Sequence, residues 1–215
     1  MRYAIRPMQA EDIPQANEIE RECFPTQWPP TSYKAEMLSN KMTHYFVAAD
    51  TEAAPEPAEQ RAQGSSSFGR LVGKMLHLRG NKSAPSQTAS QKIVGLAGVW
   101  LMAGEAHLTT IGVRDAYRKR GIGELLLMAA ISLATMHNAQ MLTLEVRASN
   151  FAAIKLYEKY GFVRVGLRRG YYSEDGEDAV LMSIEKLTSS SFQSRFQQLK
   201  QAHAQIWGPA DYRIS

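Results

Sequence analysis

The sequence predicts a single α/β domain of the α+β kind, in which helices flank one central sheet. Three observations carry this prediction. The chain has 215 residues, 44% of them hydrophobic, which suffices for one well-buried core with some chain left for loops. Short apolar segments of strand length alternate with segments in which apolar residues recur at helical spacing. Two of the strand segments flank Ala103 and Gly104, and this turn predicts a hairpin.

Seven apolar segments are expected to be strands, and they comprise residues 3–6, 42–49, 93–101, 106–113, 141–146, 162–169 and 179–185. In the fifth segment Leu142, Leu144 and Val146 share one face. Because side chains alternate along a strand, Glu145 projects from the opposite face, near the carboxyl end of a central strand. Such ends open onto the ligand site in α/β sheets.

Five segments are expected to be helical, and they comprise residues 9–22, 31–40, 121–137, 149–160 and part of a tail, 188–215. Thr31 can cap the second helix, and Ser149 or Asn150 can cap the fourth. Gly161 is well placed as the left-handed residue just past the end of the fourth helix. The helix of the tail is expected to pack against its own domain, residues 1–187, rather than against a partner.

Residues 51–92 differ in composition from the rest of the domain, being rich in Ala, Pro, Gln, Ser and Gly. We expect a flexible insertion, in which a short amphipathic helix is the alternative. Of the formal net charge of +4, +3 falls in this segment, because six Lys and Arg stand against three Glu. The remainder is close to neutral, so we expect no direct binding of nucleic acid.

The single cysteine, Cys23, excludes an internal disulfide and suits a reducing compartment. No window of the sequence approaches the roughly 18 uninterrupted apolar residues that a membrane span needs, and the first residues have no apolar signal region. These features predict a cytoplasmic protein that does not associate with membranes.

The most informative motif is a basic turn between a predicted strand and a predicted helix, Arg118-Lys119-Arg120-Gly121-Ile122-Gly123. Free amides at a helix start attract anions, and glycines let the backbone approach a phosphate closely. An ordinary turn with a solvated charge run is the alternative. The glycine spacing is not that of a dinucleotide-binding Rossmann motif.

This turn resembles the acetyl-CoA signature of the GNAT superfamily, Q/R-x-x-G-x-G/A. The resemblance implies the GNAT fold, a central mixed, mostly antiparallel sheet flanked by helices and splayed at the acetyl-CoA site. It also implies acetyl-CoA as co-substrate. Main-chain groups of Ile111, Gly112 and Val113 would engage the pantetheine arm, and amides of the residues from Lys119 to Glu124 would hold the pyrophosphate.

Acetyl transfer needs a base for the amine and a proton donor for the departing thiolate. Glu145 is the candidate base, with an ion pair to Arg147 or Arg168 as the alternative role. Tyr157 is the candidate acid, although Phe151, Ile154 and Tyr157 also fit an apolar stripe of packed residues. The residue pattern alone leaves these alternatives open.

The runs from Leu144 to Asn150 and from Ala153 to Phe162 resemble the bacterial Rim-type ribosomal-protein-alanine N-acetyltransferases. In that family the glutamate matching Glu145 accepts the proton, the tyrosine matching Tyr157 donates one, and the asparagine matching Asn150 contacts CoA. The resemblance implies a protein N-terminus as acceptor, with the N-terminal alanine of ribosomal protein S18 as substrate. It covers roughly residues 1–50 and 93–187, so the insertion and the tail depart from it.

Aromatic residues in two loops match places where N-terminal acetyltransferases grip a peptide, and we expect them to bind the acceptor; they are Phe24, Pro25, Trp28, Tyr171 and Tyr172. They can equally be structural. An isolated histidine beside a strand is more often packed than catalytic, so His107 is not expected to take part. Without a cluster at metal-ligand spacing, no metal is expected.

Two other functions compete with N-terminal acetylation. Related enzymes acetylate other protein N-termini, lysines or small amines, and the aromatic loops favour a peptide only weakly. A CoA-binding module without turnover is the third possibility, against which the presence of both Glu145 and Tyr157 argues.

Overall fold

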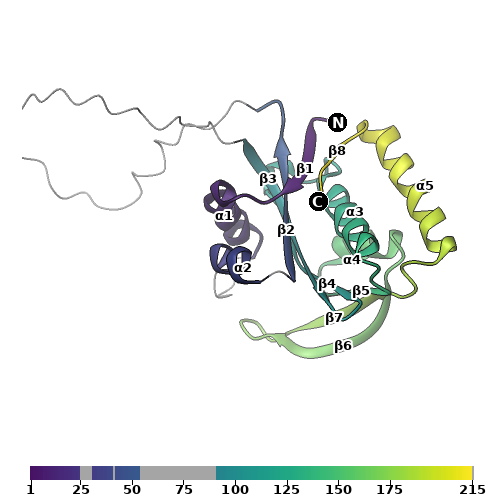
Figure 1. Cartoon of the computed structure of the whole chain (residues 1–215). Coiled ribbons are helices and arrows are strands. Elements are labelled where there is room, and N and C mark those ends of the chain that lie inside the picture. Colours follow the sequence, from purple (N-terminus) through teal and green to yellow (C-terminus); the bar gives the residue numbers. More distant parts are fainter. Residues whose placement is uncertain (25–30, 41, 54–90, 215) are drawn as a thin grey trace, which may run out of the picture.

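The computed structural model describes residues 1–24, 31–40, 42–53 and 91–214. Within these residues eight strands form one sheet, in the order β6-β7-β5-β4-β3-β2-β1-β8 (Figure 1). The strands are β1 (Tyr3–Pro7), β2 (Thr43–Asp50), β3 (Lys92–Met102), β4 (Glu105–Val113), β5 (Met141–Arg147), β6 (Val163–Tyr172), β7 (Glu177–Ile184) and β8 (Asp211–Tyr212). Only the pairs β4–β5 and β1–β8 are parallel. The predicted mixed, mostly antiparallel sheet is confirmed.

Helices cover both faces of this sheet (Figure 1). They are α1 (Ile13–Cys23), α2 (Tyr33–Ser39), α3 (Ile122–Met136), α4 (Phe151–Lys159) and α5 (Ser190–Trp207), with short 3-10 turns η1 (Ala10–Asp12) and η3 (Asp115–Tyr117). The alternation of side chains along β2 separates the two layers of the core. Phe46 and Ala48 pack in the cluster of α3, whereas Val47 and Ala49 pack in the cluster of α1.

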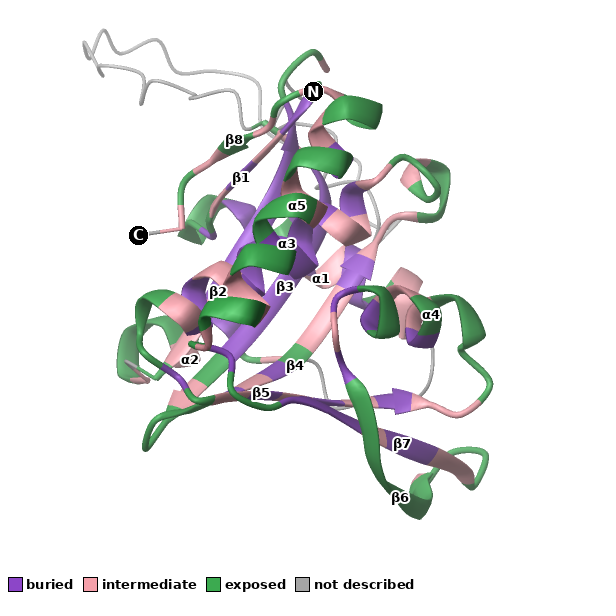
Figure 2. Ribbon diagram, turned by 90° about the vertical axis from the view of Figure 1, so that its right-hand side faces the viewer, coloured by how far each residue is buried: buried purple, intermediate pink, exposed green. Residues whose placement is uncertain are grey.

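The helix α3 is buried on nearly all sides because it lies between the sheet and α5. Phe196 of α5 belongs to the same buried cluster as Leu125 and Leu126 of α3. Strand β6, in contrast, is exposed along almost its whole length at the edge of the sheet (Figure 2). The helix that follows the basic turn, α3, is thus packed on nearly all sides, whereas the last hairpin is exposed to solvent along β6.

Two local expectations about helix ends are confirmed. The side chain of Asn150, rather than Ser149, caps α4 by accepting a hydrogen bond from the Ala153 amide at 3.2 Å. Gly161 follows α4 with a φ of 95°, the left-handed conformation that a glycine adopts without steric cost.

Two other expectations are wrong. Thr31 does not cap α2, whose N-cap is Ser32. Instead the Thr31 amide and hydroxyl both donate to the Glu20 carboxylate, a stronger acceptor that ties the start of α2 to α1. Phe151 does not belong to the buried stripe of α4, because its side chain is 68% exposed at the first position of the helix.

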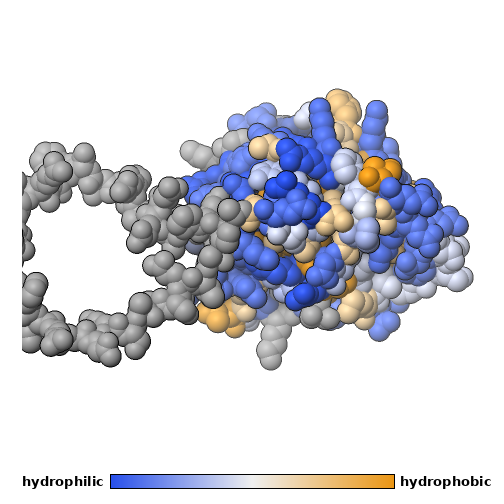
Figure 3. Space-filling view, turned by 90° about the horizontal axis from the view of Figure 1, so that it is seen from above, coloured by the Kyte–Doolittle hydropathy of each residue, from blue (hydrophilic) through white to orange (hydrophobic). Residues whose placement is uncertain are grey.

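Most of the expected insertion, residues 54–90, lies outside the described residues, as do Pro25 and Trp28. Of the helices that the structure describes, none has the length and apolar character needed to cross a bilayer. Seen from above, the surface is mostly hydrophilic, and hydrophobic residues form small separate patches (Figure 3).

Candidate active site

The central strands β4 and β5 pair at only one end. Their parallel pairing stops where His107 lies opposite Thr143. β4 nevertheless continues to Val113, still paired with β3, and β5 continues to Arg147, still paired with β7. Within the described residues, the edge of β4 that faces β5 therefore offers main-chain groups to an extended ligand that carries amides of its own.

A β-bulge in β4 accounts for this divergence. Gly98 of β3 lies opposite Thr110, and Val99 lies opposite Leu108, so Thr109 is the additional residue. A bulge bends its strand and increases the local twist. The Thr109 hydroxyl fixes the bulge by donating to the Gly98 carbonyl at 3.1 Å.

The last residues of β4 point their main-chain groups in alternate directions. The Arg114 amide donates to the Val94 carbonyl of β3 at 3.0 Å. Because successive residues of a strand face opposite neighbours, the main-chain groups of Gly112 also face β3, whereas those of Ile111 and Val113 face the open side toward β5.

Side chains from α1 and from the basic turn meet at the end of β4. The Val113 carbonyl accepts hydrogen bonds from Arg118 Nε at 3.2 Å and from the Cys23 thiol at 3.4 Å. A Cβ on Gly112 would lie 3.0 Å from Cys23 Sγ, so α1 approaches β4 closely only because residue 112 is a glycine. Burial raises the pKa of the Cys23 thiol, which keeps it protonated and unreactive.

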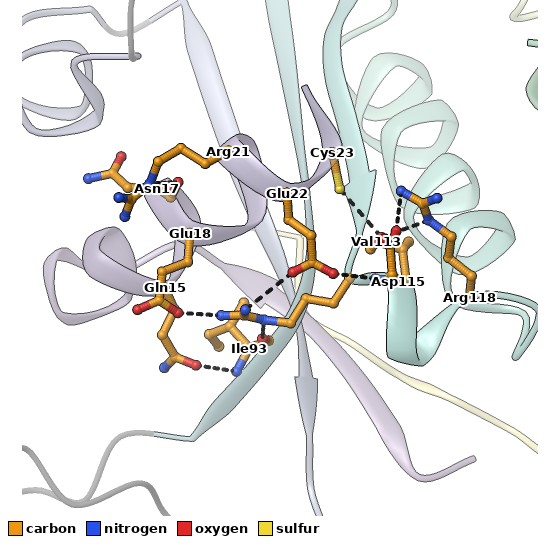
Figure 4. A network of polar contacts seen from close by, with 11 residues as sticks. Gln15, Asn17, Glu18, Arg21, Glu22, Cys23, Ile93, Val113, Asp115 and Arg118 are labelled. Carbon is orange, nitrogen blue, oxygen red and sulfur yellow. Dashed lines mark hydrogen bonds and ion pairs between the residues drawn. The ribbon is translucent and has the colours of Figure 1, made fainter. Parts of the chain in front are cut away.

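A network of polar contacts holds α1 against the start of the basic turn (Figure 4). Arg114 pairs with Glu18 at 2.7 Å, and its Nε donates to the Ile93 carbonyl at 3.0 Å. Glu22 accepts the Asp115 amide at 2.5 Å. The position of the turn relative to β3 and α1 is therefore fixed by charge-assisted hydrogen bonds.

The basic turn has the geometry of an anion site. Lys119 and Gly121 both have left-handed backbone conformations, with φ of 59° and 75°. Gly121 is the N-cap of α3 and, having no side chain, leaves the amides of the first helical turn without a capping group. Uncapped amides and the positive end of the helix dipole favour a phosphate at this position.

Gly123 supplies separate evidence that a ligand belongs here. A Cβ at this position would lie 3.8 Å from Val113 Cγ2 and 4.0 Å from Leu156 Cδ2, which are ordinary contacts. Unlike Gly121, Gly123 does not have a positive φ. Neither packing nor conformation requires glycine at residue 123, whereas close approach of a pyrophosphate would require it.

The charged side chains around the turn are held in different ways. Arg118 pairs with Asp115 at 2.6 Å, and the Arg120 guanidinium lies 5.1 Å from the Tyr117 ring centroid. Lys119 is exposed and makes no ion pair within the described residues. It is therefore the cation of the turn that is available to a phosphate.

The acidic residue of this turn, Glu124, is directed away from the anion site. Its carboxylate accepts the Tyr160 hydroxyl at 2.6 Å and pairs with the Lys159 ammonium, both at the end of α4. The Lys159 ammonium neutralises the Glu124 carboxylate, whose charge would otherwise repel a phosphate. The main-chain amide of Glu124 remains in the first turn of α3.

Glu145 lies beside the opening between β4 and β5. Its carboxylate is 3.0 Å from His107 Nε2 and 3.3 Å from Arg168 Nη1, and its side chain is 13% exposed. His107 Nδ1 is in turn 2.8 Å from the Thr143 hydroxyl. These contacts, which we call the relay, run from Glu145 of β5 to His107 of β4 and then to Thr143 of β5. They cross at the last residue pair between the two strands.

The contacts of His107 with Glu145 and Thr143 could not be predicted from the sequence, where an isolated histidine was expected to be packed. His107 and Glu145 lie 38 positions apart, and only the parallel register of β4 and β5 brings them together. The expected ion pair of Glu145 exists with Arg168, whereas Arg147 pairs with Asp175 and Glu177 of the last hairpin. In the part of the chain that the structure describes, no group of His, Cys, Asp or Glu residues could hold a metal ion.

Tyr157 is buried on α4 and packs against Phe162 at 5.7 Å between ring centroids. Burial raises the pKa of Tyr157 above its usual range, with a smaller contribution from Tyr172. Its hydroxyl is therefore protonated at neutral pH, as a proton donor must be. No described residue forms a hydrogen bond with this hydroxyl.

The two tyrosines at the end of β6 stand edge to face, with ring centroids 5.2 Å apart. The Arg147 guanidinium lies 3.9 Å from the Tyr172 ring, and that of Arg168 lies 5.5 Å from the Tyr171 ring. Burial raises the pKa of Tyr172 to about 12, opposed by Arg147 and reinforced by the charge of Glu145. The hairpin thus brings Tyr172 close enough to Glu145 for the carboxylate charge to act on its hydroxyl.

Of the residues expected in the first loop, Phe24 is described and is the C-cap of α1. It is partly buried next to Cys23, whose thiol contacts β4. The structure thus describes Phe24 at the end of α1 and Tyr171 and Tyr172 at the end of β6.

Comparisons with known proteins agree on one family. The model of the Acetyltransferase (GNAT) family matches residues 77–162. A provisionally named ribosomal protein bS18-alanine N-acetyltransferase of Bacillus subtilis is 31% identical over 84% of this chain and 94% of its own length. The N-alpha-acetyltransferase RimI of Mycobacterium tuberculosis is 33% identical over 80% of this chain and 85% of its own.

A solved structure with the same fold is that of the ribosomal-protein-S18-alanine N-acetyltransferase from Escherichia coli. It superposes with a TM-score of 0.58 and 25% identity, covering 86% of this chain and 94% of that one.

Proposed function

The chain belongs to the acetyltransferase (GNAT) family and is an acyltransferase that uses acetyl-CoA, and we propose that its acceptor is the N-terminal alanine of ribosomal protein S18. The similarity to two full-length relatives with that class of activity supports the acceptor. The observation that carries the catalytic part of the proposal is the relay from Glu145 to His107 at the opening between β4 and β5. Such an acceptor would be met in the cytoplasm.

On the donor side, main-chain groups hold the ligand. The open edge of β4 at Ile111 and Val113 pairs with the amides of the pantetheine arm. The uncapped amides from Gly121 to Glu124 and the ammonium of Lys119 hold the pyrophosphate. Acetyl-CoA supplies an activated thioester, and the Asn150 amide, beyond its capping role, contacts CoA at the start of α4.

On the acceptor side, the protein removes a proton. An N-terminal α-amine has a pKa near 8, so one proton must leave before the amine attacks. Glu145 takes this proton, directly or through water. His107 Nε2 and Arg168 hold the Glu145 carboxylate in place, and the Thr143 hydroxyl, 2.8 Å from Nδ1, fixes the orientation of the His107 ring.

Two further groups serve the collapse of the tetrahedral intermediate. A free amide on the open edge of β4 stabilises the oxyanion as it develops. Tyr157 holds a proton at its hydroxyl, and it donates that proton to the departing thiolate. Tyr171 and Tyr172, with Phe24, Pro25 and Trp28 of the first loop, enclose the first residues of the acceptor peptide.

The test is release of free thiol from acetyl-CoA in the presence of short peptides that begin with Ala, Ser, Met or Gly. A peptide of the S18 N-terminal sequence and the same peptide already acetylated at its N-terminus form the matched pair. We expect turnover on the free peptide, most rapidly with N-terminal alanine, and none on the acetylated one.

A lysine peptide with a blocked N-terminus completes the panel. Equal turnover on this peptide and on the S18 peptide would show that the protein acetylates amines in general and is not specific for N-termini. Binding of acetyl-CoA without turnover on any peptide would contradict the catalytic roles of Glu145 and Tyr157.

A further inference from the structure

The helix α5 contacts the basic turn directly. His203 Nε2 lies 3.0 Å from the Gly121 carbonyl, and the His203 side chain is only 2% exposed. A carbonyl oxygen can only accept, so Nε2 carries the proton and donates it. The same carbonyl accepts the Leu125 amide at 2.9 Å, which is the first hydrogen bond of α3. His203 thus fixes the residue at which α3 begins.

A second residue of α5 closes the other side of the turn. A Cβ built on Gly121 would lie 2.7 to 2.8 Å from three atoms of the Trp207 indole. The indole therefore occupies the space of the missing side chain and faces the left-handed glycine. Any displacement of Gly121 toward α5 is blocked by this ring.

The position of α5 is itself fixed at both ends. At its start, Ser189 caps the helix and Phe192 approaches Gly161, where a Cβ would be 3.2 Å from its ring. In its middle, Arg195 donates to the Lys159 carbonyl at 3.3 Å. Beyond its end, β8 pairs with β1. Contacts with the end of α4 and with the sheet thus fix the position of α5.

We propose that His203 and Trp207 are positioning residues of the acetyl-CoA site, which hold the Gly121 turn in the geometry that binds pyrophosphate. The inference rests on the proposed placement of the pyrophosphate at this turn. Lys119 and Gly121 are both left-handed, and a left-handed lysine persists only where surrounding contacts enforce it. The contacts from α5 act at Gly121, two residues after this lysine, and hold the end of the turn at the start of α3.

Four single variants test the inference by steady-state kinetics. His203→Leu removes the donor to Gly121, and His203→Gln retains an N–H at a similar distance from the backbone. Trp207→Ala removes the indole, and Ile206→Ala removes a neighbouring side chain that is 70% exposed. We expect His203→Leu and Trp207→Ala to raise the KM for acetyl-CoA about tenfold, with kcat and the KM for peptide within about twofold of wild type.

His203→Gln and Ile206→Ala are expected to resemble the wild type in all three constants. A purely structural role of α5 would instead lower the thermal unfolding midpoint of His203→Leu and Trp207→Ala while leaving the KM of the folded fraction unchanged. That result would overturn the inference.

A fluorescence titration tests the same contact without any destabilising change at the turn. A protein with Trp28→Phe and Trp100→Phe retains Trp207 as its single tryptophan. We expect saturating CoA to change the emission of Trp207, and unchanged emission would contradict its contact with the CoA-binding turn.

Isothermal titration of the wild type with CoA separates the two proposals. Absence of CoA binding would remove the proposed function. Binding of CoA with neither a response of Trp207 nor a change of KM in the variants would remove only the role of α5.

Discussion

The donor and acceptor sides of the active site are built by different means. On the proposed donor side, the ligand would meet backbone, namely the open edge of β4 and the uncapped start of α3, which is held between the sheet and α5. On the acceptor side, it meets side chains of an exposed hairpin, whose shape depends on ion pairs and on aromatic rings stacked with arginines.

The two sides are therefore expected to tolerate different kinds of substitution. A binding site made of backbone is sensitive to any added Cβ and indifferent to most surface side chains, whereas a site made of side chains is sensitive to single truncations. Glu145 lies where the two sides meet. We therefore expect substitutions of Glu145 to lower kcat and to leave the KM for acetyl-CoA and the KM for peptide unchanged.

Glu145→Gln is expected to have the largest effect. It removes the base but keeps an acceptor for His107, and we expect kcat to fall on the order of 10²-fold or more, with CoA binding nearly intact. Initial rates at saturating acetyl-CoA and peptide measure kcat, and calorimetry measures the binding of CoA. Glu185→Gln, at an exposed carboxylate after β7, is the matched control; equal loss in both variants would contradict the role of Glu145.

Tyr157→Phe is expected to lower kcat by about 10²-fold, because the ring and its packing against Phe162 remain while the proton donor is lost. The thermal midpoint of the variant should stay close to that of the wild type. Turnover close to the wild-type rate would show that the thiolate leaves without a proton from this residue.

Gly123→Ala tests the donor side. We expect the KM for acetyl-CoA to rise about tenfold, because the new methyl group occupies the space of the ligand. Stability should be unchanged or higher by up to about 1 kcal/mol, since alanine favours the helix. Gly121→Ala is the comparison, and there the contact with Trp207 and the positive φ predict a clear loss of stability. An unaltered KM for acetyl-CoA in Gly123→Ala would show that the pyrophosphate does not bind against residue 123.

Tyr172→Ala tests the acceptor side. Loss of the ring under Arg147 is expected to raise the KM for peptide about fivefold and to leave the KM for acetyl-CoA unchanged. Tyr172→Phe retains the ring and should bind peptide as the wild type does. A larger effect on acetyl-CoA than on peptide would break the division between the two sides.

The smallest effect concerns the hairpin at low pH. Hydrogen bonds from Arg147 and Ser149 lower the pKa of Glu177 to about 2, below its ordinary value of 4.5. Its contribution to stability is therefore fully present above pH 4.5 and disappears as the pH falls through about 2. Thermal unfolding of the wild type and of Glu177→Gln should differ above pH 4.5 and converge near pH 2; a constant difference would contradict this assignment.

Local patterns were sufficient to predict much of this architecture. Alternation along 141–146 placed Glu145 opposite the buried leucines, and the burial of Leu142, Leu144 and Val146 confirms it. The family and its fold followed from the basic turn and the strands around it. Each of these features depends on residues close together in the chain.

The features that could not be predicted depend on distant contacts. His107 reaches Glu145 through the strand register, and Thr31 binds Glu20 across a helix packing that no local pattern specifies. Likewise, His203 and Trp207 meet Gly121 from more than 80 positions away. In each case tertiary structure, rather than local propensity, selects the partner.

The pairing of β8 with β1 has a consequence for how the protein is made. Ala4 lies opposite Asp211, so the edge of the sheet closes only when segments from far apart in the chain have met. Chains generally fold as they are synthesised, from the N-terminal side, and contacts of such large sequence separation form slowly. The sheet through β7 and the helix α3 can thus assemble before α5 has been synthesised. Competence to bind acetyl-CoA would then appear only once α5 has packed against the basic turn.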